Sequence, residues 1–228
     1  MADDAPGESR RRGPRPRHSR REVTEAAVAI ADAEGLDAVT IRAVAARLGA
    51  GAMSLYSYVP DKQALVYDMV EQVSEELVLP AQPSGDWRAD LRGLARQQRA
   101  LLHRHPWLVE ALSHRQPLGP GTLAYLEFTL AVLEPIGLEA GAALESTALL
   151  NGFVVNLVRS ELADAEAAGA DPALAAEAGE RLRELLASGL YPRFAAALAG
   201  GGGEPGVDLG EHFDRLIDRV LDGLIRPG

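Results

Sequence analysis

Hydrophobic residues recur at helical spacing along most of the chain. In segment after segment, apolar positions stand three and four residues apart, the spacing that gathers them on one face of an α-helix. No stretch of useful length alternates apolar and polar residues, as a half-buried β-strand would. The pattern therefore predicts an all-α protein.

Three short helices are expected near the N-terminus. The first covers residues 19–35, between a serine that can cap it and a glycine that ends it. The second follows the N-capping Thr40 and runs to residue 48, where Gly-Ala-Gly reverses the chain. The third, 52–58, is too short to persist without neighbours to pack against.

Longer helices, punctuated by Gly and Pro, are expected in the remainder. They cover residues 61–79, 86–104, 106–113, 120–134, 138–167, 172–199 with a break at Gly189, and 208–225. Two segments of biased composition interrupt this pattern. Residues 163–179 are rich in alanine and acids, and residues 199–206 contain four consecutive glycines. Both are expected to be mobile connections rather than packed elements.

Charge is segregated along the chain, whose net charge is -10. Residues 1–62 hold ten basic and nine acidic side chains, so their net charge is +1 and that of the remainder is -11. Seven arginines lie within residues 9–22, beside prolines and glycines that cannot form a core. We therefore expect residues 1–18 to be a disordered basic arm in front of an acidic body, either contacting DNA or only solubilising the chain.

Several classes of protein are disfavoured by composition. There is no cysteine, which removes disulfides, thiolate metal sites and cysteine nucleophiles and fits a reducing cytoplasm. No uninterrupted apolar run predicts a membrane span. Enzyme motifs such as H-E-x-x-H or a phosphate-binding glycine loop are absent, and the aspartates at 214, 218 and 222 alternate with arginines. We expect no enzyme activity, no cofactor and no permanent metal.

The two short helices with a glycine turn, preceded by a helix, match a helix-turn-helix. In that motif the second helix of the pair enters the DNA major groove. The same arrangement also occurs in helical bundles that never bind nucleic acid, so the pattern alone leaves both possibilities open.

The residues of this segment resemble the DNA-binding domain of the tetracycline repressor (TetR) family. The resemblance lies in T-x-R-x-V-A-x-x-L-G at 40–49 and S-L-Y-x-Y-V-x-x-K at 54–62, within residues 19–70. The basic arm and His105-Pro106-Trp107 also resemble the subgroup that contains the tetracycline repressor itself. The resemblance implies a three-helix helix-turn-helix domain at 19–66, followed by a helical effector-binding and dimerisation domain at 67–228.

The resemblance assigns DNA contacts to residues around the turn. A guanidinium near the start of the second helix can fork onto guanine or phosphate, small apolar side chains can touch thymine methyls, and phenols can reach phosphates. Alternatives stay open: a solvated arginine, a core tyrosine, or a threonine that only caps. Ala52 and Met53 replace the polar and proline pair of the tetracycline repressor, so a different operator is expected. The candidates are Thr40, Arg42, Ala52, Met53, Ser54, Tyr56, Tyr58 and Lys62.

The second domain is expected to form a homodimer and to bind a small, largely apolar effector. The resemblance places the interface on the helices at 138–167 and 208–225, although their apolar stripes equally suit a core. Asn151 and Asn156 are expected to be buried amides that bond either neighbouring backbone or an effector. The candidate pocket residues, each of which also suits ordinary core packing, are His103, Trp107, Tyr125, Phe128, Asn151, Phe153 and Asn156.

These features predict a cytoplasmic transcriptional repressor that a small effector releases from palindromic operator DNA. The effector would move the long helix after Lys62 and change the separation of the two recognition helices in a dimer. An activator or an architectural DNA-binding protein without an effector would share the same N-terminal domain. A helical enzyme is the remaining alternative.

Overall fold

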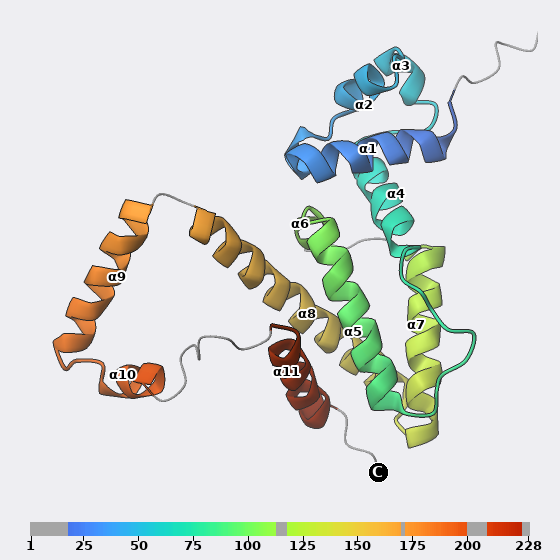
Figure 1. Ribbon diagram of the computed structural model, residues 1–228. Helices are drawn as coiled ribbons and strands as arrows, with labels where there is room; N and C mark the ends of the chain where they lie inside the picture. The colour runs from blue at the N-terminus through green and yellow to red at the C-terminus, as the bar shows by residue number, and fades with distance from the viewer. Residues whose placement is uncertain (1–17, 113–117, 170–171, 200–208, 225–228) are drawn as a thin grey trace, which may run out of the picture. The chain divides into compact units, whose positions relative to one another are not determined.

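The computed structural model describes residues 18–112, 118–169, 172–199 and 209–224 (Figure 1). Every regular element in these ranges is helical, which confirms the all-α prediction. The chain divides into two compact units, residues 1–69 and 70–228. The sequence predicts this boundary three residues earlier, between residues 66 and 67.

The first unit contains α1, α2, α3 and the beginning of α4. Their bounds are α1 Arg20–Glu34, α2 Ile41–Arg47, α3 Ala52–Leu55 and α4 Lys62–Ser74, with a 3-10 turn at Leu36–Ala38. Helix α4 spans the boundary between the units: its residues up to Met69 belong to the first unit and those from Val70 to the second. It ends at Ser74, earlier than the residue 79 expected from its apolar pattern, because the backbone turns at residues 75–77.

Local sequence sets the ends of these helices as expected. Ser19 accepts a hydrogen bond from the backbone N–H of Glu22, whose carboxylate accepts one from the Ser19 N–H, and this reciprocal pair caps α1. Gly35 ends α1 at φ 83°, a conformation that disfavours side chains. The Thr40 hydroxyl accepts from the Ala43 N–H at 3.0 Å and so starts α2.

A small apolar core holds the four-residue α3 in place. Leu55 from α3 and Val59 just after it are fully buried, together with Val44 of α2 and Leu65 of α4. A helix of one turn has no stability of its own, so this burial is what keeps it folded. The rest of α3 is left free to face outward.

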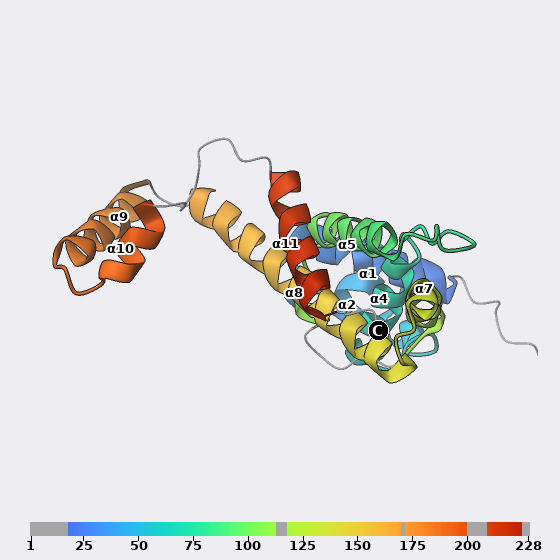
Figure 2. The ribbon, with the colours of Figure 1, turned by 90° about the horizontal axis from the view of Figure 1, so that it is seen from below.

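The second unit is built around four helices that lie side by side: α5, α7, α8 and α11 (Figures 1 and 2). Fully buried aliphatic side chains fill the space between them, Leu91, Leu102, Leu133, Val154, Ile217 and Leu221 among them. The bounds of the unit's α-helices are α5 Trp87–Arg104, α6 Leu108–Ala111, α7 Pro120–Leu133, α8 Ala140–Gly169, α9 Pro172–Ala187, α10 Pro192–Ala199 and α11 Leu209–Leu224.

Helix α8 contains one segment, Ala140–Ala167, that is long and apolar enough to cross a membrane by length and composition alone. From the sequence we expect no span, because Asn151, Gly152 and Asn156 interrupt the apolar run. In the structure α8 contacts α5, α7 and α11. Buried residues such as Leu150, Val154 and Val158 therefore pack within the unit, whereas Leu144 and Leu149 of the same helix are exposed.

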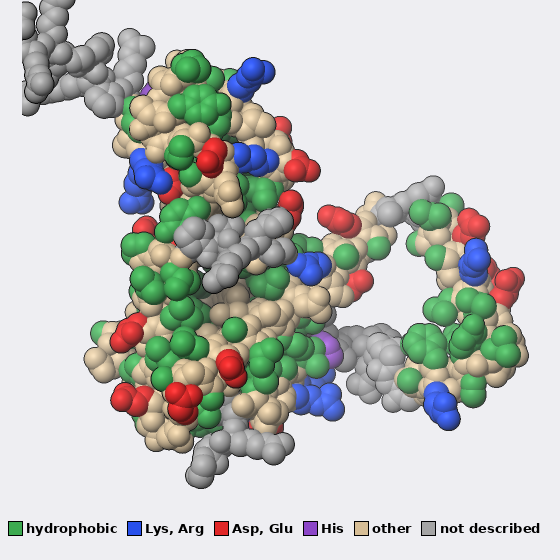
Figure 3. All heavy atoms as spheres, turned by 180° about the vertical axis from the view of Figure 1, so that it is seen from behind, with side chains coloured by type: hydrophobic (Ala, Val, Ile, Leu, Met, Phe, Trp, Pro, Cys, Tyr) green, Lys and Arg blue, Asp and Glu red, His purple; other side chains and the backbone are tan. Residues whose placement is uncertain are grey.

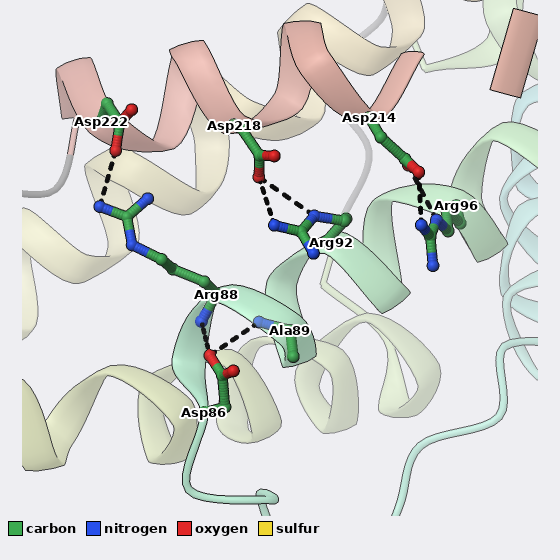
Figure 4. Close-up of polar contacts among 8 residues, drawn as sticks. All are labelled: Asp86, Arg88, Ala89, Arg92, Arg96, Asp214, Asp218 and Asp222. Carbon is green, nitrogen blue, oxygen red and sulfur yellow. Dashed lines mark hydrogen bonds and ion pairs between the residues drawn. The ribbon is translucent and has the colours of Figure 1, made fainter. Parts of the chain in front are cut away.

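A row of ion pairs joins α11 to α5 (Figure 4). Arg88 pairs with Asp222 at 2.7 Å and Arg92 with Asp218 at 2.6 Å. The third pair is Arg96 with Asp214. The three aspartates therefore form the solvated ladder that their alternation with arginines suggests, but their partners lie on α5 and not on α11 itself.

The segment expected to be a mobile connection at 163–179 is instead helical where the structure describes it. Helix α8 continues to Gly169 and α9 begins at Pro172. Alanine, which dominates this segment, is the best helix former, and its propensity outweighs the lack of a buried face. Large apolar side chains gather on the exposed surface of α9, α10 and the turn between them (Figure 3), among them Leu174, Leu190 and Phe194.

Candidate DNA-binding surface and effector cavity

The start of α3 presents an exposed apolar and hydroxyl surface. The Met53 side chain is 82% exposed and that of Tyr56 is 49% exposed, both high values for such large apolar groups. Ser54 is also exposed and its hydroxyl donates to the Gly51 carbonyl at 2.6 Å, while Ala52 is half-buried. These side chains stand outside the core because Leu55, one turn on, is the residue that anchors α3.

Arg42 on α2 and Lys62 on α4 are both exposed. The Lys62 ammonium donates to the Leu36 carbonyl at 3.1 Å, which ties the start of α4 to the turn after α1. An ammonium has three donors, so this bond leaves others for a ligand. Tyr58 is half-buried, as the alternative of a tyrosine packed against the domain suggests.

Two arginines at the edge of the basic arm have partners inside the first unit. Arg20 forms a two-pronged ion pair with Asp68, at 2.6 and 2.8 Å, and its pKa is raised by the hydrogen bonds to that carboxylate. Arg21 pairs with Glu25 one turn along α1. The other arginines of the arm lie outside the described residues.

The second unit contains a cavity of about 120 Å³ behind the end of α4. Five leucines form part of its wall, and the polar residues come from α4, α5, α7 and α8. The described residues that line it are Ser74, Leu77, Gln98, Leu101, Leu102, Leu108, Leu112, Gly121, Thr122, Tyr125 and Asn151. An apolar cavity with a few polar groups is typical of small-molecule sites.

Most hydroxyl protons at this cavity are already used within the protein. The Tyr125 hydroxyl donates to the Asn151 side-chain oxygen at 2.7 Å, and the Ser74 hydroxyl donates to the Val70 carbonyl at 2.7 Å. Burial raises the pKa of Tyr125 to about 12, although its bond to Asn151 opposes this shift. The Gln98 side-chain oxygen is buried and has no hydrogen-bond partner among the described residues.

Glu71 joins the last turn of α4 to the first turn of α7. Its carboxylate accepts from the Gly121 N–H at 2.8 Å and from the Thr122 hydroxyl at 2.6 Å. A carboxylate is favoured at the N-terminus of a helix, where backbone N–H groups lack partners. A side chain at position 121 would meet the Glu71 carboxylate at 3.2 Å, so glycine allows this close approach.

Of the predicted pocket residues, the structure brings Tyr125 and Asn151 together at the cavity. Trp107 and Phe128 are buried in the core, and Phe153 is half-buried; none of the three is among the described residues that line the cavity. The expectation that both amides are buried is wrong: Asn151 is half-buried and Asn156 is exposed. Five residues separate it from Asn151, which turns it about 140° around the helix.

His103 also lies elsewhere, on the surface between α5 and α8. Its Nε2 is 2.6 Å from a Glu161 carboxylate oxygen, and Arg99 donates to the same carboxylate. Burial raises the pKa of Glu161, but the hydrogen bonds from Arg99 and His103 outweigh it, so the pKa is lowered. His103 is therefore part of an ion-pair cluster and is not among the described cavity residues.

Sequence reasoning missed three polar residues of the cavity, Ser74, Gln98 and Thr122, and a signal exists for Gln98. Leu91, Leu94 and Leu101 form the apolar stripe of α5, and residue 98 stands at the next position of that stripe. A polar residue at a core position requires a partner. The leucines that line the cavity carry no such signal, because they look like any other core residue.

Family models match both units of the chain. Residues 23–69 match "Bacterial regulatory proteins, tetR family", and residues 79–226 match "Tetracyclin repressor-like, C-terminal domain". The chain is 40% identical over 218 residues to the HTH-type transcriptional repressor DrrR1 of Streptomyces coeruleorubidus, covering 93% of this chain and 79% of that protein. It is 32% identical to an HTH-type transcriptional regulator of Saccharopolyspora erythraea, covering 89% and 82%.

Solved structures with the same fold include ActR of Streptomyces coelicolor. Apo ActR superposes with a TM-score of 0.74 at 26% identity and covers 93% of this chain and 96% of its own. ActR in complex with actinorhodin superposes with a TM-score of 0.75, also at 26% identity, covering 91% and 95%. The sequence, the fold and these relatives agree: the chain belongs to the TetR family of bacterial transcriptional regulators.

Proposed function

We propose that this chain represses transcription as a homodimer on palindromic operator DNA and that a small, largely apolar effector releases it. The family is that of DNA-binding regulators, and the relative at 40% identity is named a repressor. The single observation that carries the effector part is the cavity, whose wall includes Ser74 at the end of α4 and Leu77 in the turn that follows.

The proposed DNA contacts divide into reading and positioning groups. Ala52, Met53 and Ser54 at the start of α3 read base edges, with Met53 placed to contact a thymine methyl because its apolar side chain is so exposed. Arg42 reads a guanine or clamps a phosphate. The remaining candidates position the protein on the DNA backbone: Thr40, Tyr56, Tyr58 and Lys62.

The proposed dimer uses the outer faces of α8 and α11. On α8, Leu144 and Leu149 are 41% and 58% exposed in the single chain, beside the small residues Ala148 and Gly152, which are also exposed. On α11, Phe213, Ile217 and Leu221 are buried in the core, while Leu216, Val220 and Leu224 are half-buried. Uncovered apolar side chains on two neighbouring helices suit a partner subunit.

The proposed release mechanism acts through α4. This helix is continuous from Lys62 to Ser74, so its first turns belong to the DNA-binding unit and its last turn forms part of the cavity wall. A cavity of about 120 Å³ is smaller than the roughly 300 Å³ or more of a typical ligand pocket. A larger effector therefore has to move the wall, and α4 carries that movement to the helix-turn-helix. Because ActR, which has the same fold, has been solved in complex with actinorhodin, actinorhodin is the first effector to test.

Selection from random duplex DNA with the full-length protein tests this function. A palindrome should be enriched, and the affinity for it should fall when actinorhodin or another effector binds. Replacing Arg42 or Lys62 by methionine should weaken binding and reduce the slope of log affinity against log salt by about 0.9 for each phosphate that the variant no longer neutralises. Arg21→Met is the matched control, because Arg21 already pairs with Glu25. A monomer without sequence preference would refute the proposal.

A further inference from the structure

The side chain of Met53 stands in solvent at the start of α3. Met53 is 82% exposed, the highest value among the large apolar residues that the structure describes. Its neighbours Ala52 and Ser54 are small, and Leu55 is the residue that turns into the core. The thioether of Met53 is therefore open to small reagents in water whenever no DNA covers it.

The chain contains little other sulfur. It has no cysteine and three methionines, Met1, Met53 and Met69. Met69 is fully buried in α4, and Met1 lies outside the described residues. Cysteine and methionine are the side chains on which mild oxidants act, and exposure governs which of them react. Of the two methionines that the structure describes, Met53 is the one that an oxidant in solution can reach.

Hydrogen peroxide converts a methionine into its sulfoxide. The sulfur lone pair attacks one oxygen of the peroxide and the O–O bond breaks. The second oxygen leaves as hydroxide, which takes the proton of the transferred oxygen and becomes water. The sulfur thereby loses two electrons, and the peroxide is reduced. The product is an uncharged but polar side chain, and methionine sulfoxide reductases convert it back to methionine.

A sulfoxide at position 53 would oppose the reading of bases by α3. The proposed contact of Met53 with a thymine methyl needs an apolar side chain. A methyl group has no hydrogen bond to donate to the sulfoxide oxygen, and the closing interface removes the water that would. Burying an unpaired polar group in this way weakens binding about fivefold to a hundredfold. Contacts to phosphates keep their strength, because the sulfoxide carries no charge.

We propose that Met53 is an oxidation-sensitive site: a peroxide converts its thioether to the sulfoxide while the protein is off the DNA, and the sulfoxide form no longer reads the operator. This proposal rests on the proposed function, because it requires that Met53 reads bases. It adds a second signal, an oxidant, that relieves repression without using the effector cavity.

The first measurement is the rate at which each methionine gains an oxygen. The full-length protein is treated with hydrogen peroxide, and peptide mass spectrometry follows the oxidation of each site. Met53 is expected to react at least about tenfold faster than the buried Met69. The palindromic duplex obtained from random DNA by selection should slow the oxidation of Met53, because the bound DNA covers its side chain.

The second measurement is the affinity of the oxidised protein for that palindrome. It should be about fivefold to a hundredfold lower than before oxidation. Affinity for random duplex DNA, and the slope of log affinity against log salt, should not change, because phosphate contacts determine both. These two constants separate lost base reading from unfolding. Methionine sulfoxide reductases specific for each of the two epimers, with a dithiol as reductant, should restore the affinity.

Three variants locate the effect. Met53→Leu keeps an apolar side chain that cannot form a sulfoxide, so peroxide should not change its affinity for the palindrome. Met69→Leu is the matched control and should stay as sensitive to peroxide as the unaltered protein. Met1 is present in both variants, so any effect of its oxidation would persist in Met53→Leu. Met53→Gln places a polar side chain of similar length at the site and should weaken palindrome binding without peroxide.

Any of three results overturns the proposal: Met69 is oxidised as fast as Met53, oxidation of Met53 leaves the palindrome affinity unchanged, or Met53→Leu responds to peroxide as the unaltered protein does. If a palindrome is selected and one of these results is found, the DNA-binding function stands and only the oxidation proposal fails. A protein that selects no palindrome would refute both.

Discussion

Replacing Glu71 by alanine should lower the free energy of unfolding of the second unit by about 2 kcal/mol. The carboxylate accepts from the Gly121 N–H and the Thr122 hydroxyl at the start of α7. Without it the hydroxyl can turn to a nearby carbonyl or to water, but the half-buried N–H loses a charged acceptor, worth about 1.5–3 kcal/mol. Glu71→Gln should cost about 1 kcal/mol, because an amide oxygen still accepts from the N–H but the charge at the helix N-terminus is gone.

Denaturant unfolding followed by tryptophan fluorescence measures this effect in the correct unit, since both tryptophans, Trp87 and Trp107, lie in residues 70–228. Protein concentration must be held constant, because dimerisation would add to the apparent stability. Gln72→Ala is the matched control: it makes a similar change of helix propensity in α4, at a side chain with no hydrogen bond within the described residues. Equal midpoints for Glu71→Ala and Gln72→Ala would refute the reasoning.

Three other predictions concern the first unit and the ion pairs between α5 and α11. Leu55→Ala should destabilise the first unit by about 2–5 kcal/mol and unfold it, which fast amide exchange in α1 and α2 would show. The unfolding transition of the second unit, followed by tryptophan fluorescence, should stay in place. A shift of that transition as well would contradict independent unfolding of the two units. Reversing one ion pair with Arg92→Asp should destabilise the second unit, and adding Asp218→Arg should restore it, with a coupling energy of about 0.5–1 kcal/mol in a double-mutant cycle; a coupling of zero would show that the pair contributes nothing. Hydrogen bonds from Arg96 lower the pKa of Asp214. The stabilisation from this pair is therefore fully present above the usual aspartate pKa and is lost as the pH falls through the lower pKa of the folded state. The difference in unfolding free energy between the unaltered protein and Arg96→Met should shrink in acid, and a constant difference would exclude this linkage.

Helix boundaries could be predicted from the sequence where a local interaction sets them. Ser19 and Thr40 each bond a backbone N–H three residues ahead, and Gly35 adopts a conformation that other residues disfavour. None of these depends on the rest of the fold. The exposure of the start of α3 could also be predicted from local sequence, because Leu55 is the only large aliphatic side chain of that helix besides Met53.

The cavity could not be predicted from the sequence in the same way, because it depends on which helix faces meet. The apolar content of α8 gives no direction, so Asn151 and Asn156 could not be assigned to different sides without the helix placed against its neighbours. Aromatic residues such as Trp107 and Phe128 attract attention as ligand contacts, yet they fill the core and leucines surround the cavity. A polar residue at a core position, as at Gln98, is the more useful sign.

The spacing of the charges between α5 and α11 has a consequence for how α11 finds its place. Arginines and aspartates both repeat every four residues and the helices run antiparallel, so sliding α11 by one repeat would still match two of the three pairs, Arg88 with Asp218 and Arg92 with Asp214. Electrostatic attraction thus holds α11 against α5 but tolerates the wrong alignment. The different shapes of Phe213, Ile217 and Leu221, all fully buried, must therefore reject the slipped arrangement.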